Sequence, residues 1–304
     1  MKTSHSLIFT SSFKCGTVFG VMLFALVLLP SHTFGQILYE TDGTSGNVNQ
    51  ISSTGVVSTL ASGFVDPTLL AIDSTGTLFV VDNSLGYIDN VTPGGVVSHF
   101  LLSNRTTGVA FDSSGNLFTS DSQANITSKF TPGVGGSAFA TFPSPAALAF
   151  NSTGTLFAVS SLGVFSSIHE VTPAGVVSLF TLAPFATGLA IDSSGNLFVS
   201  SSGGAISEVA PDGTVSTFAS GFSSPEGLAF DSNGNLFVAD SGDGTISEVT
   251  PDGTVSTFAT GLTNPQGLAF SSVPEPADTS TILGLASLAA CGCWNRRRSQ
   301  KSCV

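Results

Sequence analysis

The chain has 304 residues, of which 41% are hydrophobic and only 9% are charged. Between positions 37 and 272 it carries 18 acidic residues and two basic ones, Arg105 and Lys129, so this body has a formal charge of 2 − 18 = −16. Such an acidic body repels phosphate backbones, and we therefore expect no nucleic-acid partner. Every cysteine lies outside it, at Cys15, Cys291, Cys293 and Cys303, which excludes a disulfide or a thiolate metal site within the body.

Residues 1–35 have the features of a secretory signal peptide. Lys2 and Lys14 supply positive charge near the start. The run GTVFGVMLFALVLLP, which has no charged residue, forms the apolar core of the signal. Thr33 and Gly35 then occupy the −3 and −1 positions of a cleavage site before Gln36. The sequence therefore predicts an exported protein.

The middle of the chain repeats one motif. The segments AIDSTGTLFVVD, AFDSSGNLFTSD, AFNSTGTLFAVS, AIDSSGNLFVSS and AFDSNGNLFVAD are variants of one pattern, and a truncated GLAFSS follows them. Their anchor positions are spaced by 39, 39, 41, 39 and 40 residues, at Asp73, Asp112, Asn151, Asp192, Asp231 and Ser271. A constant period of this length is typical of propellers and other repeat folds.

Each unit contains four β-rich runs separated by turn residues, as in GLAF, LFVAD, TISEVT and VSTFA of the last complete unit. Four strands in about 40 residues form one blade of a β-propeller. The LF-type and GLAF-type runs each occur six times, but the chain opens in mid-unit with ILYETD and closes in mid-unit with GLAF. We therefore predict an all-β, six-bladed propeller over 36–272, closed by pairing of N- and C-terminal strands in one blade. The small residues of the GLAF runs are expected near the axis, where only Gly and Ala are expected to fit, and Phe and Leu are expected between blades.

The pattern P-x-G-L-A-F-D-x-x-G-N-L-F-V-A-D resembles the NHL repeat and, more loosely, gluconolactonase-like and streptogramin-lyase-like propellers. The resemblance to gluconolactonases implies a divalent cation such as calcium near the axis, held by Glu, Asn and Asp side chains. Glu226 is a candidate first ligand, but no full set can be matched. The lyase resemblance implies a histidine-centred site, which the sequence does not place.

Residues 273–304 resemble a PEP-CTERM sorting tail of bacteria. The tail combines a Pro-Glu-Pro motif, an apolar segment and a basic stop, formed by Val273, Pro274, Glu275 and Pro276, the run TSTILGLASLAACGCW, and Arg296, Arg297 and Arg298. The resemblance implies processing by an exosortase-type enzyme, transient membrane insertion of the tail, and a destination at the cell surface or in the extracellular matrix, with a link to exopolysaccharide. A retained membrane anchor is the alternative, and Cys291 and Cys293 depart from the pattern without an explanation.

Candidate site residues lie where the repeats differ. The repeated aspartates at the first turn (Asp73 and its equivalents) are interpreted as turn caps. Just before each small-residue run, the units carry side chains expected to ring one mouth of the axial channel, at Thr68, Thr107, Ala146, Thr187, Glu226 and Gln266. Glu226 is the only charged member, and the polar ones are the ligand candidates. His99 and His169, the two histidines of the body, are assigned structural or surface roles.

No phosphate loop, zinc spacing or nucleophile elbow occurs, so the sequence predicts no catalytic residue and favours a non-enzymatic protein. The leading hypothesis is an exported surface or matrix propeller that binds glycan or protein partners. A metal-dependent lactonase-like or lyase-like enzyme using the axial channel is one alternative, and a purely structural matrix protein is another.

Overall fold

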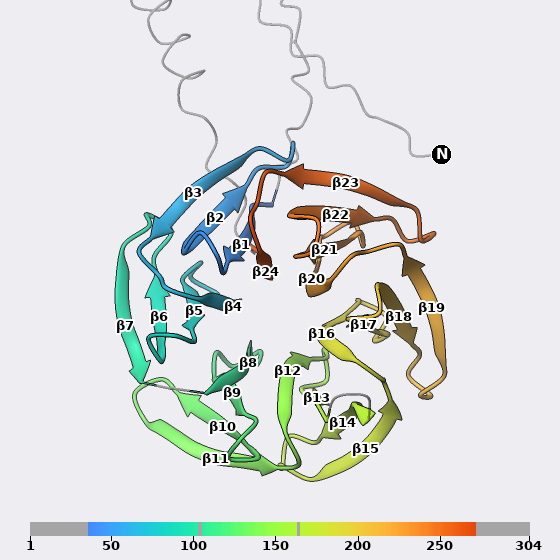
Figure 1. Ribbon diagram of the computed structural model, residues 1–304. Helices are drawn as coiled ribbons and strands as arrows, with labels where there is room; N and C mark the ends of the chain where they lie inside the picture. The colour runs from blue at the N-terminus through green and yellow to red at the C-terminus, as the bar shows by residue number, and fades with distance from the viewer. Residues whose placement is uncertain (1–35, 103–104, 163–164, 272–304) are drawn as a thin grey trace, which may run out of the picture. The chain divides into compact units, whose positions relative to one another are not determined.

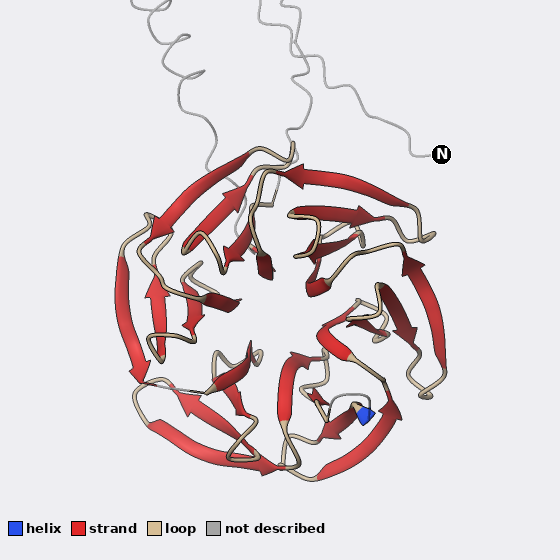
Figure 2. Cartoon of the chain, viewed as in Figure 1, coloured by secondary structure: helices blue, strands red, loops and turns tan. Residues whose placement is uncertain are grey.

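The computed structural model describes residues 36–102, 105–162 and 165–271 (Figure 1). The predicted signal peptide and the predicted sorting tail both lie outside these residues. The described residues are almost entirely strands and the turns that join them (Figure 2). No helix within this part of the chain is long and apolar enough to cross a membrane.

The strands form six antiparallel four-stranded sheets, numbered here as blades 1 to 6 around a ring. From the innermost strand outward, blade 1 contains β24 (Pro265–Phe270), β1 (Leu38–Asp42), β2 (Asn47–Ile51) and β3 (Val57–Ser62), and blade 2 contains β4 (Pro67–Ile72), β5 (Leu78–Asp82), β6 (Tyr87–Val91) and β7 (Val97–Leu102). Blade 3 contains β8 (Thr106–Phe111), β9 (Leu117–Asp121), β10 (Ile126–Thr131) and β11 (Gly135–Thr141), and blade 4 contains β12 (Pro145–Phe150), β13 (Leu156–Ser160), β14 (Ser167–Val171) and β15 (Val177–Leu182). Blade 5 contains β16 (Ala186–Ile191), β17 (Leu197–Ser201), β18 (Ala205–Val209) and β19 (Val215–Ser220), and blade 6 contains β20 (Pro225–Phe230), β21 (Leu236–Asp240), β22 (Thr245–Val249) and β23 (Val255–Thr260). The predicted all-β, six-bladed propeller is confirmed.

Blade 1 closes the ring as the sequence predicts. The last strand, β24, pairs with the first, β1, and Leu38 lies opposite Phe270. The backbone N–H of Ser271 also donates to the carbonyl of Ile37 at 2.8 Å. Because β1 is paired on both sides, closure removes the free inner edge that an open blade would expose.

Apolar side chains fill the space between blades. A phenylalanine on the second strand of a blade makes edge contacts with one on its outer strand and with one on the innermost strand of the next blade, as Phe237 does with Phe258 and Phe270 at centroid distances of 4.8 and 4.9 Å. Edge-to-face pairs are the favoured arrangement of aromatic rings. The predicted filling of the blade interfaces by Phe and Leu is confirmed.

Glycines of the innermost strands allow neighbouring blades to approach at the axis. A Cβ atom placed on Gly227 would lie 2.1 Å from the carbonyl oxygen of Gln266 on the next blade, and one on Gly188 would lie 2.2 Å from that of Glu226. Larger residues also lie at the axis, however, since Leu228 and Leu189 follow these glycines and line the channel. The expectation that only Gly and Ala fit near the axis is therefore wrong for the position after the glycine.

Repeated aspartates hold the turns. The Oδ1 atom of Asp192 accepts the backbone N–H groups of Ser194 and Asn196, both at 2.8 Å. A second set of aspartates at the end of the second strand binds the preceding loop: Asp240 accepts the N–H groups of Ser223 and Ser224 at 2.8 and 2.7 Å. Both sets satisfy backbone donors that no strand partner reaches, which is a structural role.

Candidate functional site

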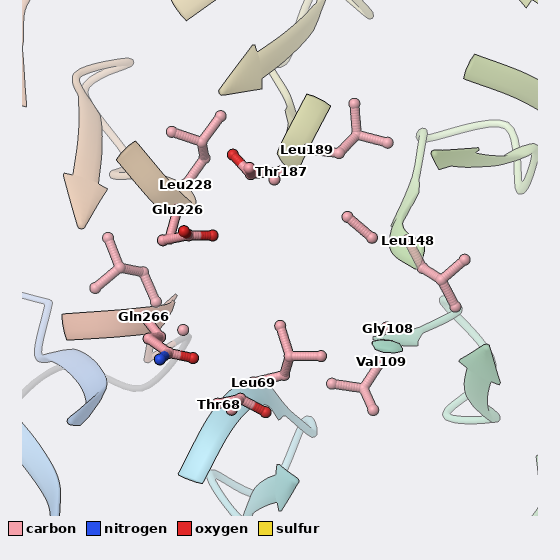
Figure 3. Close-up of a pocket in the computed structure, with 15 residues that line it drawn as sticks. Thr68, Leu69, Gly108, Val109, Leu148, Thr187, Leu189, Glu226, Leu228 and Gln266 are labelled. Carbon is pink, nitrogen blue, oxygen red and sulfur yellow. The ribbon is translucent and has the colours of Figure 1, made fainter. Parts of the chain in front are cut away.

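The axial channel contains a cavity of about 110 Å³ at the mouth where the innermost strands begin (Figure 3). Its rim carries four polar side chains contributed by β4, β16, β20 and β24, namely Thr68, Thr187, Glu226 and Gln266. A layer of small residues follows, and below it five aliphatic side chains form the floor, namely Val109, Leu148, Leu189, Leu228 and Leu268. The cavity is thus polar at its opening and apolar beneath.

Three threonines of the predicted ring are already engaged. Thr187 donates its hydroxyl to the carbonyl of Pro225 at 2.8 Å, and Thr107 donates to the carbonyl of Pro145 at 2.7 Å. Thr68 accepts the side-chain amide of Asn83 at 3.0 Å. The hydroxyls of Thr107 and Thr187 therefore tie one blade to the next and keep only acceptor capacity for a ligand.

Glu226 and Gln266 are the uncommitted polar groups of the rim. They lie at equivalent positions of adjacent innermost strands, and Figure 3 shows both directed into the opening. Neither side chain makes a hydrogen bond or ion pair with the described part of the chain, and both are half-buried. Loss of water around the carboxyl raises the pKa of Glu226.

The opposite side of the mouth is poorer in polar groups. Ala146 presents only a methyl group at its position, and neither it nor Thr107 is among the residues that line the cavity. Leu69 stands where four other blades have glycine, and its side chain projects into the channel (Figure 3). The predicted ring is therefore a one-sided polar arc centred on Glu226 and Gln266.

The divalent-cation site implied by the gluconolactonase resemblance does not fit this rim. Calcium takes six to eight oxygen ligands, with carboxylates prominent among them. Glu226 is the single carboxylate of the rim, and no group of three His, Cys, Asp or Glu residues within the described ranges is arranged to hold a metal ion. The neutral neighbours Thr68, Thr187 and Gln266 are weak cation ligands, so the rim offers too few strong ligands for calcium.

The two histidines lie away from the mouth. His99 on β7 contacts Asp89 through Nδ1 at 2.5 Å and stacks on Tyr87 with ring centroids 4.3 Å apart. His169 on β14 stacks on Phe142, and burial lowers its pKa. Neither histidine lines the axial cavity, which agrees with the structural or surface roles assigned from the sequence.

Glu40 is a chemically distinctive residue that the repeat comparison passed over. It lies on β1 with none of its surface exposed, where the equivalent residue of blade 6 is Val238. Its Oε2 accepts the Asn49 amide at 2.9 Å, and its Oε1 is buried without a hydrogen-bond partner. Burial is the main cause that raises the pKa of Glu40 to about 8. The signal was visible in LYETD, where an acid replaces the apolar residue of LFVAD.

The comparison with known proteins supports this fold and does not assign an activity to the chain. The NHL repeat model matches residues 222–248, which lie mainly in blade 6. No curated protein matches the chain significantly. The fold and the repeat together define the class, a six-bladed β-propeller with an NHL-type repeat.

Many solved structures are similar to the chain, and three of them illustrate the likeness. A streptogramin B lyase has 16% identity and a TM-score of 0.60, with 78% of this chain and 89% of that chain covered. A gluconolactonase from Xanthomonas campestris has 17% identity and a TM-score of 0.63, with coverage of 78% and 92%. A catalytically inactive virginiamycin B lyase from Staphylococcus aureus, solved with quinupristin, has 15% identity and a TM-score of 0.58, with coverage of 79% and 94%. At these identities the likeness is one of fold.

Proposed function

We propose that the propeller binds a neutral, hydroxyl-rich ligand such as a glycan at its axial mouth. The observation that carries this proposal is the pair formed by Glu226 and Gln266, whose side-chain polar atoms have no hydrogen-bond partner in the described chain. A carboxylate accepts hydrogen bonds, whereas a primary amide both donates and accepts, and vicinal hydroxyls offer both kinds of group. The net charge of −16 over residues 37–272 disfavours anionic ligands.

The size of the cavity limits how the ligand enters. A volume of about 110 Å³ is below the range of about 300–1,000 Å³ that encloses a drug-sized ligand. We therefore expect one hydroxyl-bearing edge of a sugar to enter the mouth, with its less polar face above Leu69, while the remainder stays outside.

The test is binding of the purified full chain to an array of neutral oligosaccharides, with Glu226→Gln as the variant and Glu248→Gln on β22 as the matched control. Glu226→Gln removes the charged acceptor and should weaken binding at least about 10-fold, the effect of about 1.4 kcal/mol. Glu248→Gln changes net charge equally and should leave binding unchanged. Equal loss in both variants, or no binding by the unaltered chain, would refute a glycan site at the mouth; protein partners would then be sought.

We also propose that the chain is exported and sorted to the cell surface or extracellular matrix. The leader before Gln36 and the tail that begins at Val273 support this destination, including processing by an exosortase-type enzyme. Trp294 is the sole tryptophan and lies beyond the Pro-Glu-Pro motif. Material released from the surface should therefore show tyrosine fluorescence only, and tryptophan emission from it would contradict cleavage near the motif.

A second candidate is a lactonase-like or lyase-like enzyme acting at the same mouth. The raised pKa of Glu226 favours it, because a desolvated carboxyl can act as a general acid or base. The similar solved structures include lyases and a gluconolactonase. Turnover of lactone substrates that is lost in Glu226→Gln would establish the enzyme, whereas binding without turnover supports the first candidate. A purely structural matrix protein would show neither.

A further inference from the structure

A cleft between blades 2 and 3 combines an unpaired carboxylate oxygen with aromatic rings. It lies at the turns that follow the innermost strands, at the other end of those strands from the rim residues, and does not share a residue with the axial cavity. Its volume is about 710 Å³, against about 370 Å³ for the corresponding cleft between blades 5 and 6. The larger value lies within the range of ligand-binding pockets.

The carboxylate belongs to Asp73. Its Oδ1 caps the turn by accepting the N–H groups of Thr75 and Thr77 at 2.8 and 2.9 Å, and its Oδ2 makes no hydrogen bond within the described chain. In the other three repeats with aspartate here, Oδ2 accepts an asparagine amide, from Asn116 at 2.7 Å, Asn196 at 2.9 Å and Asn235 at 3.1 Å respectively. Thr77 replaces that asparagine in blade 2, so one Asp73 oxygen is left for a ligand.

Four phenylalanines form the aromatic part of the lining, namely Phe79, Phe100, Phe111 and Phe130. Phe79 makes edge contacts with Phe100 and Phe111 at centroid distances of 5.0 and 4.9 Å. Phe100 is 44% exposed, whereas the equivalent Phe139, Phe180, Phe218 and Phe258 are half-buried. An aromatic surface therefore faces solvent at this cleft.

Phe130 accounts for part of the difference from the other blades. Its position on β10 corresponds to Val249 on β22, which is fully buried, but Phe130 is only half-buried. The ring lies over Gly136, where an added Cβ atom would be 2.4 Å from a ring carbon. The Phe–Gly pair thus takes the place of a Val–Val pair and puts a further ring into the cleft wall.

No basic residue lines this cleft. Lys129, the neighbour of Phe130 in sequence, points to the opposite face of its sheet, where its Nζ lies 3.8 Å from Asp112 and 5.4 Å from the Phe118 ring centroid. Aromatic rings attract cations through their negative faces, and a carboxylate adds charge complementarity. We propose that the cleft binds an organic cation, an ammonium group carried on an aromatic or apolar body.

The experiment is calorimetric titration of the purified full chain with benzyltrimethylammonium, compared with uncharged benzyl alcohol. Asp73→Asn should weaken binding of the cation at least 10-fold while preserving the turn, because Asn151 caps the same turn in blade 4 with bonds of 3.1 and 2.9 Å to Thr153 and Thr155. Asp192→Asn makes the same change in charge at the cleft between blades 5 and 6 and should leave the affinity within twofold. Phe130→Val, which restores the residue type of four other blades, should weaken binding several-fold.

Thermal unfolding of each variant separates loss of binding from loss of fold. The proposal is overturned if the unaltered chain fails to bind benzyltrimethylammonium at millimolar concentration, or if benzyl alcohol binds as tightly. It is also overturned if Asp192→Asn weakens binding as much as Asp73→Asn, because attraction to the acidic surface as a whole would then explain the result.

Discussion

Blade 6 and blade 1 lie side by side, yet they carry different residues at some equivalent strand positions. On its second strand blade 6 carries Val238 inside an apolar interface, whereas blade 1 carries Glu40. Both blades keep the aspartate that binds the preceding loop, Asp240 in one and Asp42 in the other. Residues that recur in most of the repeats hold the fold, and ionisable residues that break the repeat are where chemistry and pH dependence should be sought.

The largest expected effect concerns Glu40. Its pKa is about 8 in the folded chain against an ordinary value of 4.5, so the folded state retains a proton that the unfolded state loses. Stability should therefore fall as pH rises from about 4.5 to about 8, and the full loss is on the order of 5 kcal/mol above that window. Glu40→Gln should remove this dependence, and denaturant unfolding of both proteins at pH 5 and pH 9 measures it.

The buried protonated carboxyl would be refuted if the difference in unfolding free energy between the unaltered protein and Glu40→Gln were the same at pH 5 and pH 9. Val238 supplies the matched position in blade 6, and Val238→Glu should introduce the same pH dependence at greater cost, because no Asn49 equivalent faces it: Ser247 occupies that place.

The loop-binding aspartates come next. Asp42 accepts four backbone N–H groups, from Thr44, Ser45, Thr263 and Asn264, whereas Asp240 accepts two from the preceding loop. A hydrogen bond to a charged group is worth about 1.5–3 kcal/mol, and the loss is smaller where water can replace the missing acceptor. Asp240→Ala should cost about 2–3 kcal/mol and Asp42→Ala more, as measured by denaturant unfolding. The reverse order would show that closure does not depend on the Asp42 contacts.

A smaller loss is expected at the axis. Gly227→Ala places a methyl group against the Gln266 carbonyl, 2.1 Å away before relaxation, and should cost about 1–3 kcal/mol. Gly203→Ala is the matched control, since its nearest neighbour is the Ser201 hydroxyl at 3.5 Å. Thermal midpoints of the two variants test the comparison. Equal midpoints would mean that the blades can separate at the axis without cost.

The smallest effect is expected from calcium. The rim has a single carboxylate, so saturating calcium followed by excess chelator should leave the thermal midpoint, followed by circular dichroism, unchanged. Only a ligand that prefers the folded state raises this midpoint. A clear calcium-dependent rise that disappears in Glu226→Gln would restore the metal-dependent enzyme as the leading candidate.

The fold could be predicted almost completely from the sequence, because the period of about 40 residues and the half-units at both ends fix the number of blades and their closure. The capping role of Asp192 and its equivalents could be predicted for the same reason: a repeated polar residue at a turn satisfies a repeated backbone geometry.

The candidate site was only partly predictable. The ring position of Glu226 and Gln266 followed from the alignment of repeats, but the engagement of Thr107 and Thr187 depends on proline carbonyls of the next blade, about 38 residues away. Asp73 looked like its equivalents in sequence. Its free oxygen results from Thr77, four residues later, and half of its aromatic surroundings, Phe111 and Phe130, come from the next blade. These features depend on contacts between blades, which cannot be predicted from the spacing of the repeats.

The central claim is that the polar arc of Glu226 and Gln266, and not the whole ring predicted from the sequence, recognises the ligand. The most direct measurement is titration of the full chain with the neutral oligosaccharide that binds best on the array, comparing Gln266→Ala with Thr107→Val across the channel. The account predicts at least a 10-fold loss of affinity in Gln266→Ala and less than a twofold change in Thr107→Val. Equal losses, or a loss only in Thr107→Val, would contradict it.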